Sequence, residues 1–165
     1  HYGLVRAHEP HRQALETMLN RELPAELLEL DSTLDPPRYF TAVDIHQHPG
    51  GVCGDSLAGV IYERGARSTT PLLQRDLDLH YRLVDLISQH ISPSRIVDLG
   101  CGFGKSTRPI YQEFPDAEVT GVDISAPCLK LAAVTAADDE VAGVRYRQAT
   151  AEATGLDEQS ADLVT

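Results

Sequence analysis

Residues 95–107 read RIVDLGCGFGKST, and three glycines stand there between an apolar run and a polar one. The apolar run from Ile96 to Leu99 has the length of a short buried strand, and a helix is predicted from about Lys105 to Phe114. Glycine lets the backbone turn sharply and pass close to a ligand. The stretch therefore predicts a strand, a ligand-binding turn and a helix.

Two phosphate-binding patterns fit this turn poorly. A phosphate-binding loop that ends at residues 104–106 (GKS) requires a glycine at the position that Leu99 occupies. The dinucleotide fingerprint GxGxxG requires a wider spacing than the GxGxG formed by Gly100, Gly102 and Gly104. Glycine turns between a strand and a helix are common, so GxGxG alone is a weak signal.

Residues 96–104, IVDLGCGFG, resemble the first motif of the class I S-adenosylmethionine-dependent methyltransferases, in which an acidic residue and GxGxG follow a strand. The cofactor has no phosphate, so a short loop suffices, and the N–H groups that begin the next helix suit its carboxylate. An acidic residue suits its ammonium and sulfonium charges. The resemblance implies that the cofactor binds to Asp98, Gly100, Cys101, Gly102 and Gly104, with Cys101 as a small apolar filler.

A second acidic residue, Asp123, ends the predicted strand AEVTGVD, 25 positions after Asp98. In the family such a carboxylate binds the ribose hydroxyls, and Ile124 after it would pack on the adenine. The same carboxylate also fits the ribose of NAD, so Asp123 does not discriminate between the two cofactors. Ser125 is predicted to cap the helix that follows.

The end of the chain, from Arg147 onward, is similar to the family pattern Asp-Ala-Glu, loop, Phe-Asp-Leu-Val. Ala151 and Glu152 match the first triplet, and residues 162–164 match the strand. Thr150 replaces the family's Asp and Ala161 its Phe, and both departures concern the adenine contact. We place Thr150, Ala151 and Glu152 at the adenine on this resemblance.

Strands and helices alternate in the second half of the chain. A helix is predicted at 72–90, and strands follow at 95–100, 117–123, 144–148 and 161–165, with helices between the first three. The alternation predicts an α/β fold with a doubly wound, mainly parallel sheet, and right-handed crossovers place its first three strands in the order 3-2-1. The resemblance makes this fold Rossmann-like and implies the order 3-2-1-4. We assign residues 71–165 to the cofactor-binding domain, truncated after its fourth strand, and expect the chain to be the N-terminal part of a longer protein.

Residues 1–70 are predicted to form a separate region of helices and loops that covers the substrate. Apolar residues at 15–23 recur at helical spacing, and a short helix is predicted from Pro24 to Leu30. The later part is rich in Gly, Pro and Asp, which predicts loops and a β-hairpin around Val43 and residues 60–62. Asp44, His46 and His48 alternate there, but without a third histidine they do not predict a metal site.

The net charge of −11 disfavours nucleic acids and anionic membranes as partners and favours a small-molecule acceptor. Three cysteines without a CxxC pair do not form a disulfide framework, and no apolar run spans a bilayer, so we expect a cytoplasmic protein. The family implies methyl transfer from S-adenosylmethionine; the sequence reveals no catalytic base and no oligomeric state. Two alternatives remain, an NAD-dependent oxidoreductase and a non-catalytic S-adenosylmethionine-binding module. We expect residues 1–165 alone to be poorly active.

Overall fold

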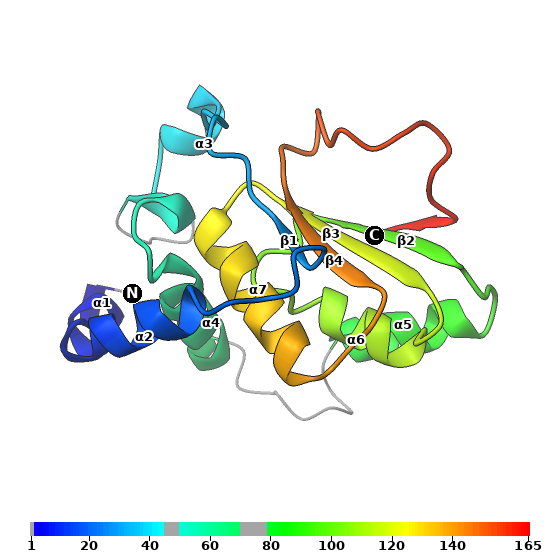
Figure 1. Cartoon of the computed structure of the whole chain (residues 1–165), viewed down its shortest axis with the longest axis horizontal. Coiled ribbons are helices and arrows are strands. Elements are labelled where there is room, and N and C mark those ends of the chain that lie inside the picture. The colour runs from blue at the N-terminus through cyan, green and yellow to red at the C-terminus, as the bar shows by residue number, and fades with distance from the viewer. Residues whose placement is uncertain (1, 45–49, 70–78) are drawn as a thin grey trace.

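A computed structural model of the chain describes residues 2–44, 50–69 and 79–165, and it contains a five-stranded sheet in the order β1-β4-β3-β2-β5 (Figure 1). All four neighbouring strand pairs are parallel. The elements are α1 (Tyr2–His8), η1 (Glu9–His11), α2 (Arg12–Leu19), β1 (Leu28–Glu29), α3 (Arg38–Thr41), η3 (Gly51–Cys53), α4 (Ala58–Thr69), α5 (Leu79–Ser88), β2 (Arg95–Leu99), α6 (Thr107–Glu113), β3 (Glu118–Asp123), α7 (Ala126–Asp138), β4 (Val144–Gln148) and β5 (Leu163–Val164).

The predicted strand order is confirmed. The four strands expected in the order 3-2-1-4 are β4, β3, β2 and β5, and they lie side by side in that order. The register is continuous across the centre, where Val97 pairs with Thr120 and Thr120 with Arg145. This register brings the carboxyl ends of β2, β3 and β4 to one edge of the sheet. In open α/β sheets ligands bind at that edge.

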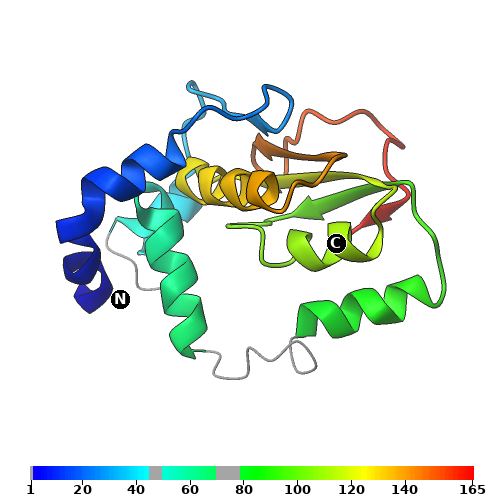
Figure 2. The ribbon, with the colours of Figure 1, turned by 60° about the horizontal axis from the view of Figure 1, so that its bottom comes forward.

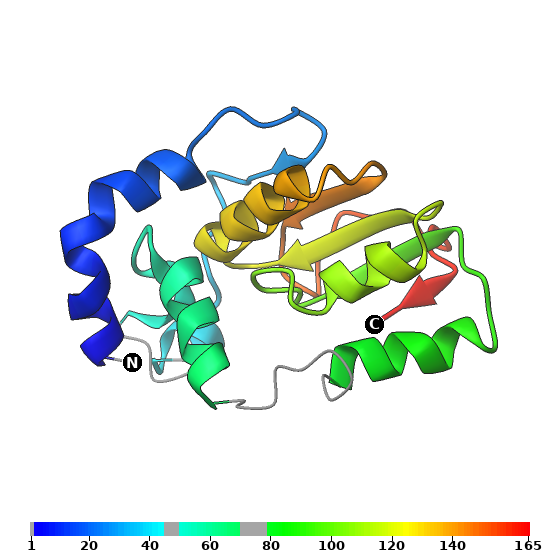
Figure 3. The ribbon, with the colours of Figure 1, turned by 90° about the horizontal axis from the view of Figure 1, so that it is seen from below.

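The two faces of the sheet are built differently. Figure 3 shows α6 and α7 on one face of the sheet. Ile96, Val119 and Tyr146 are buried and form the main core with residues of these two helices. Val97 and Val122 point to the other face and pack with the loop that leads to β5. Because both faces are covered at the centre, the middle residues of β2 and β3 are buried on both faces.

The N-terminal region adds β1 to the sheet, where the sequence predicted a helix from Pro24 to Leu30. The residues after Pro24 make a single turn, in which Leu27 N donates to Pro24 O at 3.0 Å. The chain then extends along β4, and Tyr146 N donates to Leu27 O at 2.8 Å. The helix prediction was wrong because the open edge of β4 supplies hydrogen-bond partners that local sequence does not reveal.

The predicted hairpin around residues 60–62 is also wrong, because α4 occupies this segment. Leu57 and Ile61 lie one helical turn apart, and both are completely buried. Asp55 begins the helix by accepting a hydrogen bond from Leu57 N at 2.8 Å. Three consecutive apolar residues do not distinguish a strand from one stripe of a buried helix.

The N-terminal helices gather beside α7. Figure 2 shows α1, α2 and α4 grouped on one side of α7, away from α5. The predicted helix at 15–23 corresponds to α2, which ends at Leu19. Within the range 72–90, where a helix was predicted, the described residues form α5 from Leu79 to Ser88. None of the helices within the described ranges is long and apolar enough to cross a membrane.

Candidate functional site

The glycine turn between β2 and α6 has a backbone that favours glycine. Gly100, Gly102 and Gly104 have φ angles of 74°, 54° and 84°, a left-handed region in which a side chain is strained. Gly104 is also packed closely, since a Cβ atom there would lie 3.2 Å from both Ala132 Cβ and Tyr146 Oη. A Cβ at Gly100, by contrast, would meet no atom within 4 Å. The turn therefore packs against Ala132 and Tyr146 at Gly104 and leaves open space beside Gly100.

Asp98 is buried under this turn, with 3% of its surface exposed. Its Oδ2 atom accepts hydrogen bonds from Ser106 Oγ at 2.7 Å and from Thr107 Oγ1 at 2.6 Å. Its Oδ1 atom accepts from Thr165 Oγ1 at 3.2 Å. The carboxylate therefore joins the end of β2 to the start of α6 and to β5. The sequence motif located Asp98 but not these three hydroxyl partners.

Asp123 joins the glycine turn to the end of β3. Its Oδ2 atom accepts from Gly102 N at 2.8 Å, and its Oδ1 atom accepts from Ser125 N at 2.7 Å. Burial raises the pKa of Asp123 above its ordinary value. The structure thus brings Asp123 and the turn together, although 21 residues separate Asp123 from Gly102 in the sequence.

The segment Ile124–Ser125 is held by a part of the chain that the motif did not include. Ser125 Oγ donates to Val52 O at 2.6 Å and accepts from Cys128 N at 3.3 Å, so the predicted helix cap is confirmed. Cys53 Sγ contacts Ile124 O at 3.9 Å. Residues 51–53 therefore lie at the same edge as Asp123. His46 and His48 lie outside the described residues.

The segment Thr150–Glu152 follows β4 at this edge. Ala149 N donates to Asp123 O at 3.1 Å, which ties the end of β4 to β3. Glu152 accepts a hydrogen bond from Tyr39 Oη at 2.7 Å, and this bond holds the pKa of Glu152 below its usual value. Tyr39 belongs to α3 and was not predicted, because its contact crosses 113 residues of sequence.

An aromatic pair connects α4 to the glycine turn. The rings of Tyr62 and Phe103 meet edge to face, with centroids 5.2 Å apart and planes at 80°. The same Tyr62 ring is the nearest group to Gly102, where a Cβ would lie 3.9 Å from Cε1. The sequence did not indicate Tyr62, because three consecutive apolar residues at 60–62 favoured a hairpin. Leu57 and Ile61, one helical turn apart, are the signal for a helix in this segment.

Residues 96–165, which contain this edge of the sheet, match the model of the methyltransferase domain family. This match supports the resemblance of residues 96–165 to the class I S-adenosylmethionine-dependent methyltransferases. The family resemblance inferred from the glycine motif is therefore confirmed.

The curated relatives resemble this domain over short segments. The trans-aconitate 2-methyltransferase of Klebsiella pneumoniae (strain 342) is 40% identical over 70 residues, which are 41% of this chain and 28% of that protein. The enzyme of the same name from Rhodopseudomonas palustris (strain HaA2) is 48% identical over 42 residues, 26% of this chain and 16% of that protein. The matches thus span between about a sixth and about a quarter of these relatives.

A solved structure supports the fold of the methyltransferase domain. A protein of Methanococcus maripaludis, assigned as an S-adenosyl-L-methionine-dependent methyltransferase, has a TM-score of 0.53 and 16% identity. The likeness covers 61% of this chain and 46% of that one. At this identity it shows the fold alone.

The three thiols of the chain differ in burial, and the difference predicts their reactivity. Cys101 and Cys128 are 3% and 1% exposed, and burial raises the pKa of Cys101 well above its usual value and that of Cys128 to about 12. Cys53 is half-buried, and burial raises its pKa as well. Because the thiolate is the reactive form, we expect iodoacetamide to label Cys53 first. Peptide mass spectrometry measures the order, and native Cys101 reacting as fast as Cys53 would contradict it.

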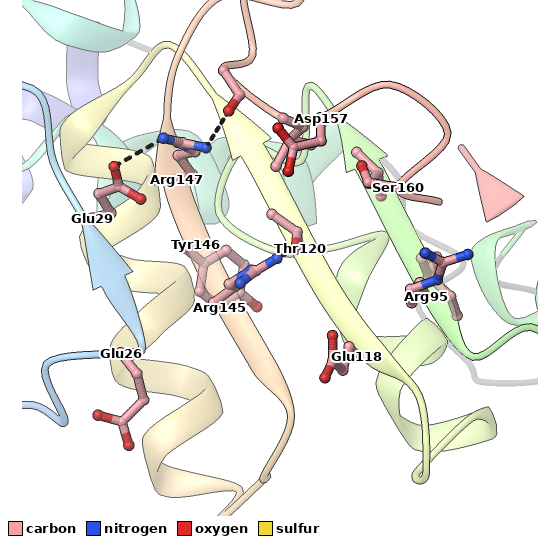
Figure 4. A pocket seen from close by; sticks show the side chains of 14 residues that line it. Glu26, Glu29, Arg95, Glu118, Thr120, Arg145, Tyr146, Arg147, Asp157 and Ser160 are labelled. Carbon is pink, nitrogen blue, oxygen red and sulfur yellow. Dashed lines mark hydrogen bonds and ion pairs between the residues drawn. The ribbon is translucent and has the colours of Figure 1, made fainter. Parts of the chain in front are cut away.

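A cavity on the face of the sheet away from α6 and α7 does not belong to this site (Figure 4). Its volume is about 230 Å³, and its lining includes the first residues of β2 and β3, at the edge away from the glycine turn. Its arginines are engaged: Arg145 Nε donates to Thr120 Oγ1 at 2.8 Å, and Arg147 Nη2 contacts Glu29 Oε1 at 3.2 Å. Over the described ranges, no group of three His, Cys, Asp or Glu side chains is arranged to hold a metal ion.

Proposed function

We propose that this chain binds S-adenosylmethionine along the edge formed by residues 100–104, 123–124 and 150–152, and that it methylates a small-molecule acceptor. The observation that carries the proposal is the position of Asp123. Its half-buried carboxylate lies at the carboxyl end of β3 and accepts a hydrogen bond from Gly102 N in the glycine turn. Ribose hydroxyls can donate to the same two oxygen atoms, because each carboxylate oxygen accepts more than one hydrogen bond.

The other predicted residues have consistent roles around this carboxylate. The open space beside Gly100 lets the methionine part of the cofactor approach the backbone of the turn, and Cys101 fills the space behind it. Asp98 supplies negative charge under the turn. Ile124 offers an apolar contact to the adenine, and the segment Thr150–Glu152 offers hydrogen-bond acceptors at its edge.

When bound, the cofactor supplies a methyl group already activated by its sulfonium. The remaining task for the protein is to align the acceptor with that methyl group and to exclude water. Tyr62 and Phe103 are suited to the second part, because their edge-to-face contact places apolar surface beside the glycine turn. We assign no general base.

The acceptor is proposed to be a small organic molecule. The matched relatives carry the name trans-aconitate 2-methyltransferase, which supports a small acid as acceptor. The chain itself carries a net charge of −11, which disfavours nucleic acid.

Calorimetric titration with S-adenosylhomocysteine tests the cofactor, with NADH as the competing ligand. We expect saturable binding of S-adenosylhomocysteine and none of NADH. Binding of NADH alone would replace the proposal with a nicotinamide-dependent activity. A transfer assay on the same preparation, with S-adenosylmethionine and trans-aconitate, separates an enzyme from a module that only binds the cofactor.

A further inference from the structure

A second cavity opens beside the glycine turn, on the face of the sheet that carries the helices. Its volume is about 440 Å³, and α4, α5, α6 and α7 all contribute to its walls. Figure 3 shows these four helices around the turn. Phe103, Gly104 and Lys105 belong to both the turn and the cavity. A molecule in this cavity would therefore lie next to the proposed cofactor site.

The cavity carries positive charge in a strongly acidic chain. Among the described residues of its lining, Arg67, Lys105 and Arg108 are basic and Glu63 is acidic. Arg67 forms an ion pair with Glu63, and Arg108 Nη2 contacts Asp139 Oδ1 at 2.8 Å. Lys105 is half-buried, and its ammonium group makes neither a hydrogen bond nor an ion pair with any residue in 2–44, 50–69 or 79–165. A half-buried ammonium without a counter-charge favours an anionic ligand.

The rest of the lining is apolar and suits a carbon skeleton. Phe103, Pro109 and Leu131 form this part of the wall, and Thr135 adds a hydroxyl. An apolar wall with a few convergent polar groups is typical of a small-molecule site. A volume of this size suits a small organic anion better than a polymer.

We infer that this cavity binds the methyl acceptor and that Lys105 recognises a carboxylate of it, with Arg108 beside it. The inference rests on the proposed function. It adds the chemical class of the acceptor, a small polycarboxylate, and names Lys105 as the residue that selects it. A phosphate-binding loop would also place a lysine after this glycine turn, but it requires a glycine where Leu99 stands. The cavity gives Lys105 a role without a nucleotide phosphate.

Calorimetric titration with trans-aconitate, citrate and tricarballylate tests this inference, with and without saturating S-adenosylhomocysteine. We expect at least one of the three to bind, and Lys105→Gln to weaken that binding roughly 10- to 100-fold, the range for a charge-assisted hydrogen bond. The affinity of wild type should also fall as salt is added.

Lys130→Gln is the matched control, because Lys130 is the only other lysine and lies outside the cavity, near Asn20. It should leave the affinity for the polycarboxylate unchanged. The inference is overturned if none of the three acids binds, or if both lysine variants weaken binding equally. If S-adenosylhomocysteine does not bind, the proposed cofactor is wrong instead. The titrations of the three acids in the absence of S-adenosylhomocysteine would then still test the cavity.

Discussion

Replacing Asp123 with alanine is expected to weaken S-adenosylhomocysteine binding by roughly 10- to 100-fold, the largest effect of any single change at the cofactor site. The estimate follows from about 1.5–3 kcal/mol for hydrogen bonds to a charged group. The variant removes the proposed acceptor for the ribose hydroxyls and also the partner of Gly102 N, which positions the glycine turn. Calorimetric titration measures the affinity, and circular dichroism confirms that the variant is folded.

Asp162→Ala is the control for this experiment. Asp162 also accepts two backbone hydrogen bonds, from Ser94 N at 3.1 Å and Arg95 N at 2.9 Å, but at the amino end of β2. Its loss removes a comparable backbone contact at the edge of the sheet away from the glycine turn. We expect it to leave S-adenosylhomocysteine affinity unchanged. Equal affinities of wild type and Asp123→Ala would contradict the assignment of the cofactor edge.

Burial of Asp123 lowers the free energy of unfolding when its carboxylate is ionised, which is the form proposed to bind the cofactor. Because its pKa is raised in the folded state, its contribution to stability is fully present below the ordinary pKa of 3.8 and is lost as the pH rises through the raised value. At neutral pH the ionised carboxylate therefore costs folding free energy. The ionised form is the stronger acceptor of hydrogen bonds from ribose hydroxyls. We accordingly expect S-adenosylhomocysteine affinity to rise with pH through the same range.

The largest effect on stability is expected from Gly59→Ala, where α4 crosses α7. A Cβ atom at Gly59 would lie 2.4 Å from Pro127 O and 3.0 Å from Cys128 Cα, so the two helices must separate. Overpacking of this kind costs about 1–3 kcal/mol of unfolding free energy, measured by urea denaturation. Cofactor affinity should fall as well, because α4 carries Tyr62 to Phe103.

Gly3→Ala makes the same substitution in a helix without the crowding. A Cβ at Gly3 would meet no atom within 4 Å, and alanine is the better helix former by up to about 1 kcal/mol. We therefore expect Gly3→Ala to be neutral or stabilising. The packing argument fails if Gly59→Ala is as stable as Gly3→Ala.

Much of the candidate site was visible in local sequence. The GxGxG spacing and Asp123 were found because each follows an apolar strand whose length and flanking residues are local properties. Ser125 was predicted as a helix cap for the same reason. The contacts of these residues were not predictable. Val52 contacts Ser125 at a sequence separation of 73, and Tyr39 contacts Glu152 at a separation of 113. The spacing of apolar residues along the chain gives no information about contacts between segments so far apart.

The sequence by itself determined the alternation of strands and helices after residue 90, and with it the order β4-β3-β2, because a right-handed crossover leaves few alternatives. The place of β5 beside β2 was expected from the family resemblance. Only the tertiary structure decided that residues 28–29 are a strand and that residues 58–69 are a helix. Each depends on a distant partner, the edge of β4 in one case and the surface of α7 in the other. The same long-range packing brings Arg67, Lys105 and Arg108 around one cavity, since α4 and α6 meet there only after the chain has folded.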